Sequence, residues 1–396
     1  MLLKGLKVID WAGWIAGPGC AGLMADWGAE VIKVETFAGD PIRSAHHDAA
    51  SGDPAGPGFT LDNRGKRGVA LDLATPAGHR AMLALLEGAD VLITNFRPGG
   101  LKRLGLDYGS IRERYPKLIY ASVSAFGLVG DEIDKAGFDI TVFWGRSGVG
   151  ASTIPPNQEP FPNRPGFGDH MTALATLAGV LAALHERSRT GVGRLVEVSL
   201  MRAAAYALGC DLSAHLRHGA TQTAVPRDQR PVANSGYFRT ADDRWVGLVP
   251  RGPADFPLLM DALGLPQLGG DPRYQPPVTD PESVQLLRTA IDAAFAKLTL
   301  EEIRERLDAA DLAWAPLATL TEFEMDPQAH AAGCFVEQPN GHGGSFWAPA
   351  GPVRFPGLDT GPAGPAPRLG EHSAEVLREA GLSEAEIAEA IGAAIG

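Results

Sequence analysis

The sequence contains few cysteines and no long uninterrupted apolar run. Cys20, Cys210 and Cys334 are its only cysteines, too few and too scattered for a disulfide framework or a Cys-x-x-Cys metal site. No stretch approaches the roughly 18 consecutive apolar residues of a membrane span. The first residues, MLLKGLKVIDWAG, enter a strand-like pattern and do not resemble a secretory signal. We therefore expect a cytoplasmic protein with no metal site and no membrane attachment.

Positive charge is also scarce. The chain has 47 Asp plus Glu against 35 Lys plus Arg, a formal net charge of −12. Non-specific nucleic-acid binding requires a basic face, so this balance argues against it. The 396 residues, 45% of them hydrophobic, suit a globular protein of two or three domains.

Strand-like and helical segments alternate through the first half of the chain. Lys7–Trp11 reads as a buried strand, a glycine-rich turn leads into a short helix, and Glu30–Glu35 reads as the next strand. Further strands are expected at 69–73, 90–94, 118–123 and 193–200. This alternation predicts an α/β fold with a largely parallel sheet, whose ligands gather beyond the carboxyl ends of the strands.

The turn after the first strand contains a literal GxGxxG, formed by Gly17, Gly19 and Gly22, with Glu35 ending the next strand. Because the motif follows a strand and opens a helix, it fits a dinucleotide fingerprint. A glycine turn that lets a helix pack closely against the sheet is the alternative. The residues by themselves leave both interpretations open.

Six basic residues cluster around the connections that follow the expected strands. Such runs are usually solvated faces, but in an acidic chain a local cluster near strand ends also indicates phosphate binding. The six are Arg64, Lys66, Arg67, Arg97, Lys102 and Arg103.

The second half of the chain reads as a separate, smaller domain. Residues 219–235 lack an apolar period and suggest a linker, 237–249 suggest a hairpin, and helices are expected near 253–263, 281–297 and 300–310. From about 335 the chain is mostly extended before a helical tail. We divide it into 1–218 as the first part of a large domain, 219–330 as the small domain with its linkers, and 331–396 as a return to the large domain.

A carboxylate precedes the most apolar helical stretch. Residues 163–184 read NRPGFGDHMTALATLAGVLAAL, with apolar positions at helical spacing on nearly every side, so we expect a buried helix. Asp169 lies at its start, where a carboxylate is either an N-cap or a functional group. The stretch alone favours the cap.

Several stretches, in order along the chain, together resemble one family. They are LKGLKVIDWAGWIAGPGCAGLMADWGAEVIKVE, NRGKRGVALDL, NFRPGGLKRLGLDY, GFGDHMTALATLAGVLAAL and LGEHSAEVLREAGL. They resemble the class III coenzyme A transferases, the family of formyl-CoA:oxalate and carnitine CoA-transferases and of α-methylacyl-CoA racemase. The resemblance implies a Rossmann-like large domain, a smaller α+β domain and an interlocked-ring homodimer. It also implies that the glycine turn serves a CoA site and not a nicotinamide site.

The resemblance implies roles for particular residues. Asp169 falls at the family's catalytic aspartate, and Phe138 and Asp139 fall in the substrate pocket. The implied CoA-binding positions are Trp14, Ile15, Ala16, Leu71, Asn95, Phe96 and Arg103.

The implied reaction moves CoA from an acyl-CoA thioester to a carboxylic acid. The aspartate attacks the thioester to give a mixed anhydride, the CoA thiolate converts it to an aspartyl-CoA thioester, and an incoming carboxylate reverses these steps. The reaction needs no permanently bound cofactor, and the sequence has no GxxxxGKS/T loop for ATP.

Several positions depart from the formyl-CoA enzyme. Thr36 stands where that enzyme has an arginine, Ala74 replaces a lysine, Ile15 replaces a glutamine, and no tetraglycine loop occurs near Asn234. Oxalate and formate are therefore poor expectations for the acceptor acid. The isoleucine and nearby aromatic residues indicate a bulkier, less polar acyl group.

Two alternatives remain. The racemase branch exchanges an α-proton between a histidine and the aspartate, but where its signature reads Gly-His-Asp this chain reads Gly137-Phe138-Asp139. His170, beside Asp169, cannot easily reach the opposite face of a substrate, so we expect it to have no catalytic duty. The other alternative is a CoA-binding protein without catalytic activity.

Overall fold

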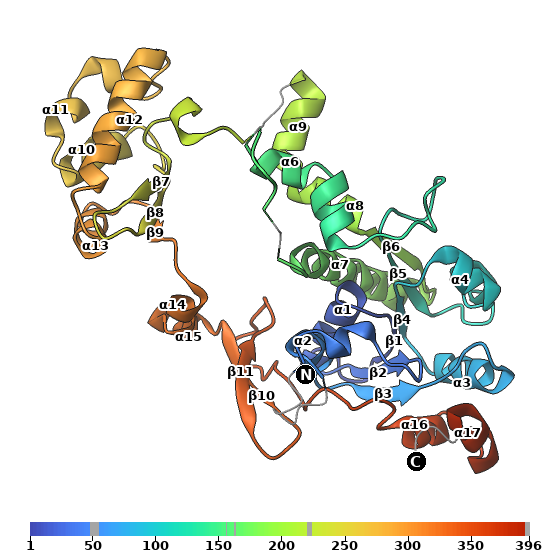
Figure 1. Cartoon of the computed structure of the whole chain (residues 1–396). Coiled ribbons are helices and arrows are strands. Elements are labelled where there is room, and N and C mark those ends of the chain that lie inside the picture. The colour runs from blue at the N-terminus through green and yellow to red at the C-terminus, as the bar shows by residue number, and fades with distance from the viewer. Residues whose placement is uncertain (48–54, 156, 162–163, 220–223, 393–396) are drawn as a thin grey trace. The chain divides into compact units, whose positions relative to one another are not determined.

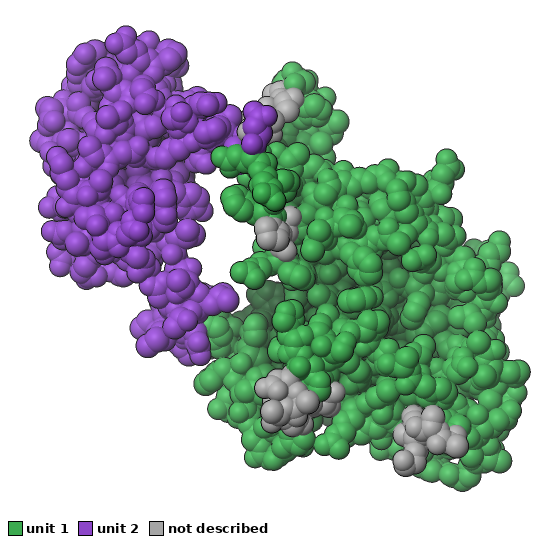
Figure 2. Space-filling view, viewed as in Figure 1, with its two compact units in different colours: residues 1–154, 158–223, 331–396 green, residues 155–157, 224–330 purple. Residues whose placement is uncertain are grey.

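The computed structural model describes residues 1–47, 55–155, 157–161, 164–219 and 224–392. The chain divides into two compact units (Figure 2): residues 1–154, 158–223 and 331–396 form unit 1, and residues 155–157 and 224–330 form unit 2. The domain boundaries predicted from the sequence lie after residues 218 and 330. Both ends of the chain belong to unit 1.

A six-stranded parallel sheet forms the centre of unit 1 (Figure 1). Its order is β3-β2-β1-β4-β5-β6, the doubly wound arrangement in which the strand order reverses beside the first strand. The predicted α/β fold with a parallel sheet is thus confirmed. The strands are β1 (Lys7–Trp11), β2 (Glu30–Glu35), β3 (Arg67–Ala70), β4 (Val91–Thr94), β5 (Ile119–Ser124) and β6 (Leu195–Ser199).

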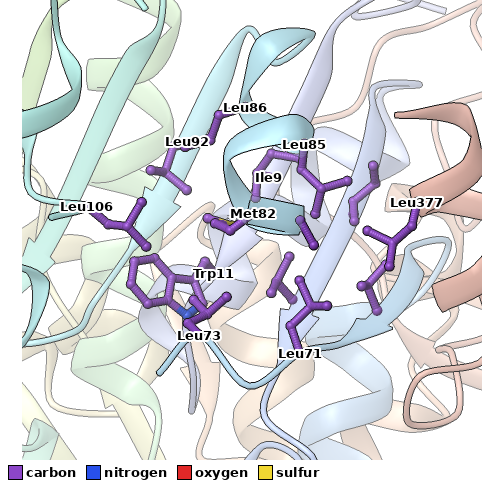
Figure 3. Packing of buried hydrophobic residues seen from close by; sticks show 14 of the residues in the cluster. Ile9, Trp11, Leu71, Leu73, Met82, Leu85, Leu86, Leu92, Leu106 and Leu377 are labelled. Carbon is purple, nitrogen blue, oxygen red and sulfur yellow. The ribbon is translucent and has the colours of Figure 1, made fainter. Parts of the chain in front are cut away.

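Helices cover both faces of this sheet, which explains why its strands read as near-continuous apolar runs. Because side chains alternate across a strand, Ile9 belongs to the core beneath the helices at residues 76–87 and 373–391, while Val8 belongs to the opposite core. Figure 3 shows the first core, where Leu85 and Leu377 meet the sheet. The helices of unit 1 are α1 (Ala16–Asp26), α2 (Pro57–Asn63), α3 (Pro76–Glu87), α4 (Pro98–Arg103), α5 (Tyr108–Ile111), α6 (Val149–Thr153), α7 (Phe167–Thr190), α8 (Leu200–Ala207), α9 (Gly209–His218), α16 (Ser373–Glu379) and α17 (Glu384–Ile391), with a 3-10 turn η1 (Pro41–Ser44) and a π-helical turn η3 (Ile140–Arg146).

Helix α7 is the apolar helix expected from the sequence, although Asn163 at the start of that stretch lies outside the described residues. Its Ala173, Leu177 and Val180 pack in the same core as α1. The prediction that it is buried on nearly every side is wrong for this chain, because Met171 and Ala175, among others, are exposed. Helix α7 is long and apolar enough to cross a membrane. Since a helix in the core of a folded protein can have the same length and composition, this is only weak evidence for a membrane span.

Unit 2 is a small α+β domain, as predicted. Its antiparallel sheet has the order β7-β8-β9. In its core the rings of Phe238 on β7 and Phe295 stack with their centroids 4.5 Å apart. Its elements are η4 (Arg227–Gln229), β7 (Gly236–Arg239), β8 (Trp245–Leu248), α10 (Asp255–Ala262), α11 (Pro266–Gly269), η5 (Pro272–Tyr274), α12 (Pro281–Phe295), α13 (Leu300–Ala309), β9 (Trp314–Pro316) and α14 (Leu320–Glu324); α15 (Pro327–Ala332) leads out of it, and the hairpin β10 (Phe335–Pro339) and β11 (Ser345–Pro349) follows in unit 1. Of the predicted linker 219–235, residues 220–223 lie outside the described residues.

Candidate active site

Two adjoining cavities open in unit 1 at the carboxyl ends of the central strands. The first, of about 530 Å³, is lined by the turns after β1, β2 and β4, by β5, by the loop before η3 and by Asp169. The second, of about 550 Å³, lies between residues 71–74 and α4 and shares Glu35, Thr36, Phe96 and Arg97 with the first. This is the crevice in which doubly wound folds bind ligands. Together the two cavities offer an elongated site.

Asp169 lies in the first turn of α7 and lines the first cavity. Burial, reinforced by the nearby carboxylates of Asp139 and Asp62 and opposed by His170, raises its pKa to about 7. Three carboxylates line this cavity, and two are held by cations: Glu35 by Arg43 and Asp40 by Lys33. Asp169 makes no ion pair or side-chain hydrogen bond within the described residues. It is therefore the carboxylate that remains available to a ligand.

Asp139 contacts the start of α7 without lining the first cavity. Its buried carboxylate accepts a hydrogen bond from the Gly168 N–H at 3.1 Å and is not among the groups that line the cavity. Burial raises the pKa of Asp139, against backbone N–H groups of Gly168, Gly166 and Asp169 that favour the charged form. These amides at the helix start thus face a protein carboxylate. Asp139 supports the site here, and its neighbour Phe138 is the residue that lines the cavity.

Gly168 has to be a glycine at this junction. A Cβ at that position would lie 2.3 Å from the Phe143 ring and 2.5 Å from an Asp139 carboxylate oxygen. The glycine before Asp169 therefore permits the buried carboxylate and ring to reach the helix start. This is the local reason for the Gly-Asp sequence that opens α7.

The predicted CoA-binding residues divide between the two cavities. Trp14, Ala16 and Asn95 line the first, Leu71 and Arg103 line the second, and Phe96 lines both. Ile15 lines neither. It packs against the small cluster around Ile42 and Phe59, so its side chain gives no support for a bulky acyl pocket.

Trp14 and Phe138, and not Ile15, form the aromatic wall of the first cavity. The rings of Trp14 and Phe138 meet edge to face, with centroids 5.2 Å apart, and both are partly exposed. Phe138 occupies the position where the racemase signature has a histidine, and a phenylalanine cannot transfer a proton.

The predicted basic cluster divides between structure and site. Arg64 pairs with Asp26, Lys66 pairs with Asp10, and Arg67 lies among glutamates that include Glu379. These three cations stabilise the fold and do not line either cavity. Of the six predicted residues, only Arg97 and Arg103 do.

Two of the three GxGxxG glycines, Gly19 and Gly22, serve helix packing. A Cβ at Gly22 would lie 2.7 Å from the Asp62 carbonyl oxygen, and one at Gly19 would lie 3.3 Å from the Ala173 Cβ. At Gly17 a Cβ would lie 2.5 Å from the Ala12 Cβ, in the turn beside the first cavity. The packing alternative therefore explains Gly19 and Gly22, and Gly17 permits the close turn after β1.

Two pairings near the site, a partly exposed one and a buried one, could not be predicted from the sequence. His170 approaches Asp62 with its Nε2 3.2 Å from Oδ1, and this hydrogen bond raises the pKa of His170 against the effect of burial. Lys33 pairs with Asp40 at 2.9 Å beneath the turn that carries Trp14. An aspartate next to a glycine in Ala38-Gly39-Asp40 carries no signal of such a role. In the described part of the chain, no group of three His, Cys, Asp or Glu side chains could hold a metal.

Comparison with known proteins gives independent evidence of the family to which this chain is similar. CoA-transferase family III matches residues 3–373. The (R)-2-hydroxy-4-methylpentanoate CoA-transferase of Clostridioides difficile is 31% identical over 390 residues, covering 98% of this chain and 97% of that enzyme. The cinnamoyl-CoA:phenyllactate CoA-transferase of Clostridium sporogenes is 32% identical, covering 98% and 95%. A solved structure of a CaiB/BaiF family protein from Brucella suis is 28% identical, with a TM-score of 0.83 over 96% of this chain and 99% of that one.

Proposed function

The chain belongs to CoA-transferase family III, and on that premise we propose that Asp169 is the nucleophile that carries CoA from an acyl-CoA thioester to a carboxylic acid. One observation carries the proposal: Asp169 is the carboxylate of the first cavity that no cation holds in the described part of the chain. The substrate is a CoA thioester, and the mechanism requires no permanently bound cofactor.

The reaction begins when the ionised Asp169 attacks the acyl carbonyl. The carbon–sulfur bond breaks, CoA leaves as its thiolate, and an acyl-aspartyl anhydride forms. The thiolate then attacks the aspartyl carbonyl of the anhydride, releasing the first carboxylate and leaving Asp169 as a CoA thioester. The incoming carboxylate repeats these two steps in reverse and departs as the new acyl-CoA. The thioester energy is conserved throughout.

The electrostatics of the site suit a carboxylate that must be both reactive and removable. A pKa of about 7 means that near neutral pH Asp169 is ionised in about half of the molecules. A carboxylate whose charge is poorly stabilised by its surroundings is the stronger nucleophile. His170 opposes the rise and preserves part of the ionised population.

The walls of the first cavity support an acyl group that is branched or aromatic. Trp14, Phe138, Ile133 and Leu200 line this cavity near Asp169. The names of two relatives contain 4-methylpentanoate, cinnamoyl and phenyllactate groups, and such groups suit apolar walls. We accordingly expect this chain to prefer them over acetate or oxalate.

Two further properties are part of the proposal. We expect a homodimer, and the exposed apolar residues of α7, such as Met171 and Ala175, support an interface there. Light scattering of the purified chain tests this directly. We also expect the enzyme to work in the cytoplasm, which fractionation of the source cells would examine.

Intact-mass spectrometry tests the central proposal. The protein and its Asp169→Ala variant are incubated with acetyl-, succinyl-, 4-methylpentanoyl- and cinnamoyl-CoA. A covalent CoA adduct on the parent and on an Asp211→Asn control, absent from Asp169→Ala, is the expected result; Asp211 is an exposed residue of α9. An adduct that persists in Asp169→Ala would refute Asp169 as the nucleophile. Deuterium uptake at the α-carbon of a thioester would favour the racemase instead.

A further inference from the structure

The turn that follows β1 has an unusual backbone. Trp14 has a φ of 64°, in the left-handed region that side chains larger than glycine rarely occupy. Such a conformation persists only where its surroundings enforce it. The φ angle also sets the direction in which the indole leaves the chain, so whatever holds this backbone also places the ring.

Side chains from β2, from the loop that follows it and from the end of β4 hold the turn. The Asn95 side chain makes two hydrogen bonds to the backbone of Gly13. Its Oδ1 accepts from the Gly13 N–H at 2.9 Å, and its Nδ2 donates to the Gly13 carbonyl at 2.7 Å. The Asp40 carboxylate accepts a hydrogen bond from the backbone N–H of Trp14 at 3.0 Å. Lys33 donates to the Ala12 carbonyl at 2.5 Å. Three consecutive residues of the turn are thus fixed by side chains.

Lys33 and Asp40 are themselves buried and tightly held. Lys33 is fully buried and donates to an Asp40 carboxylate oxygen at 2.9 Å. Burial lowers the pKa of Lys33, but the carboxylates of Asp10, Asp40 and Glu35 outweigh burial and raise it. Asp40 also donates its own backbone N–H to Glu35 at 2.8 Å. Lys33 is therefore fixed beneath the turn, and Asp40 is fixed where it lines the first cavity.

The indole that this pair supports forms part of the cavity wall. Trp14 lines the first cavity and meets the Phe138 ring edge to face. Phe138 precedes Asp139, which holds the start of α7 beside Asp169. The aromatic wall and the nucleophile therefore line the same cavity, and Asp139 joins the segment that carries Phe138 to the helix start that carries Asp169.

We infer that the Lys33–Asp40 pair is a positioning element that keeps Trp14 in its left-handed conformation against Phe138 and thereby sets the selectivity for the acyl group. The inference rests on the proposed function, since it assigns the acyl end of the substrate to this wall. It makes Lys33 and Asp40 specificity-determining residues that do not touch the substrate's reacting atoms.

Binding measurements test the inference without requiring any chemistry. In an Asp169→Ala background, calorimetry compares the Kd of 4-methylpentanoyl-CoA with that of acetyl-CoA, before and after Asp40→Ala. Misplacing an apolar wall weakens discrimination by the amount that one or two methylene groups contribute. We therefore expect the preference, defined as the Kd of acetyl-CoA divided by the Kd of 4-methylpentanoyl-CoA, to fall about tenfold. Free CoA should bind within about twofold of its original affinity, because the second cavity, with Leu71 and Arg103, is unchanged by this substitution.

The matched control is Asp26→Ala, which breaks the buried Arg64–Asp26 pair of the same unit outside both cavities. Both variants should lower the melting temperature, and only Asp40→Ala should change the Kd ratio. If both variants leave the ratio unchanged, the Lys33–Asp40 pair is purely structural and the inference is overturned.

A second variant applies if Asp40→Ala does not fold. Trp14→Gly adopts the left-handed conformation unaided but has no ring, so it should fold and should lose the preference for the larger acyl group. Retained preference in Trp14→Gly would also overturn the inference. Failure of the parent to form a covalent adduct would instead count against the proposed function, because these Kd ratios do not depend on adduct formation.

Discussion

Replacing Asp169 with asparagine should stabilise the protein, and by an amount that depends on pH. The pKa of Asp169 is raised from 3.8 to about 7 in the fold, so the folded state holds this proton more tightly than the unfolded state. The resulting contribution to stability is complete below pH 3.8 and is lost as the pH rises to about 7. Asparagine cannot ionise and escapes this loss.

The size of the effect follows from the shift. At 1.36 kcal/mol per pKa unit, ionisation of Asp169 costs the folded state about 4 kcal/mol at pH 8 and less than about 2 kcal/mol at pH 5. At about 2 °C per kcal/mol for a unit of this size, Asp169→Asn should melt roughly 8 °C above the parent at pH 8. The difference should shrink to about 3 °C at pH 5.

Differential scanning calorimetry of the parent, Asp169→Asn and Asp211→Asn at pH 5, 6, 7 and 8 measures this dependence. Asp211→Asn controls for the general effect of removing one exposed carboxylate. A gain in Asp169→Asn that does not change with pH, or no gain at all, would refute the conclusion that the fold opposes ionisation of Asp169. A nucleophile kept in a destabilising environment is a familiar exchange of stability for activity.

The other predictions concern the same helix start. Single-turnover adduct formation, followed by quenched mass spectrometry, should rise about tenfold from pH 6 to pH 8, because the ionised fraction of Asp169 rises by that factor across a pKa of about 7. Asp139→Asn, which removes a nearby like charge, should move this limb to lower pH, and His170→Gln, which removes an opposing cation, should move it to higher pH; an unmoved limb in both contradicts the electrostatic account. Gly168→Ala should destabilise unit 1 by about 2 kcal/mol in urea unfolding through overpacking, whereas Gly209→Ala, whose Cβ would meet nothing within 4 Å, should not; equal losses would remove the steric explanation.

The sequence predicted the sheet because burial on both faces leaves a plain apolar signature. Lys7–Trp11 and Glu30–Glu35 appear in the fold as β1 and β2. Asp169 lies in the first turn of its helix, but the prediction that it is the N-cap is wrong, because Gly166 occupies that position and no side chain caps the helix. These features depend on local periodicity, which a sequence records directly.

The supporting pairs could not be predicted, because each depends on a partner distant in the chain. Lys33 reads as an ordinary strand residue until the fold places Asp40 beside it. Arg64 and Lys66 look like one basic cluster, yet the turn between them directs one to Asp26 and the other to Asp10. Asp139, expected in the substrate pocket, lies behind it because Phe138 takes the cavity side of the same loop.

The joining of both chain ends in unit 1 has a consequence for synthesis of the protein. The edge strand β3 is covered by the tail, since the His372 N–H donates to the Gly68 carbonyl at 2.8 Å and the Ala70 N–H donates to Ser373 at 3.1 Å. Leu377 completes the apolar core on that face of the sheet. A nascent chain on the ribosome therefore carries an open strand edge and an uncovered apolar face until the segment that contains His372, Ser373 and Leu377 emerges. Ribosomal stalling or premature termination before residue 372 should release chains that depend on chaperones and are prone to aggregate.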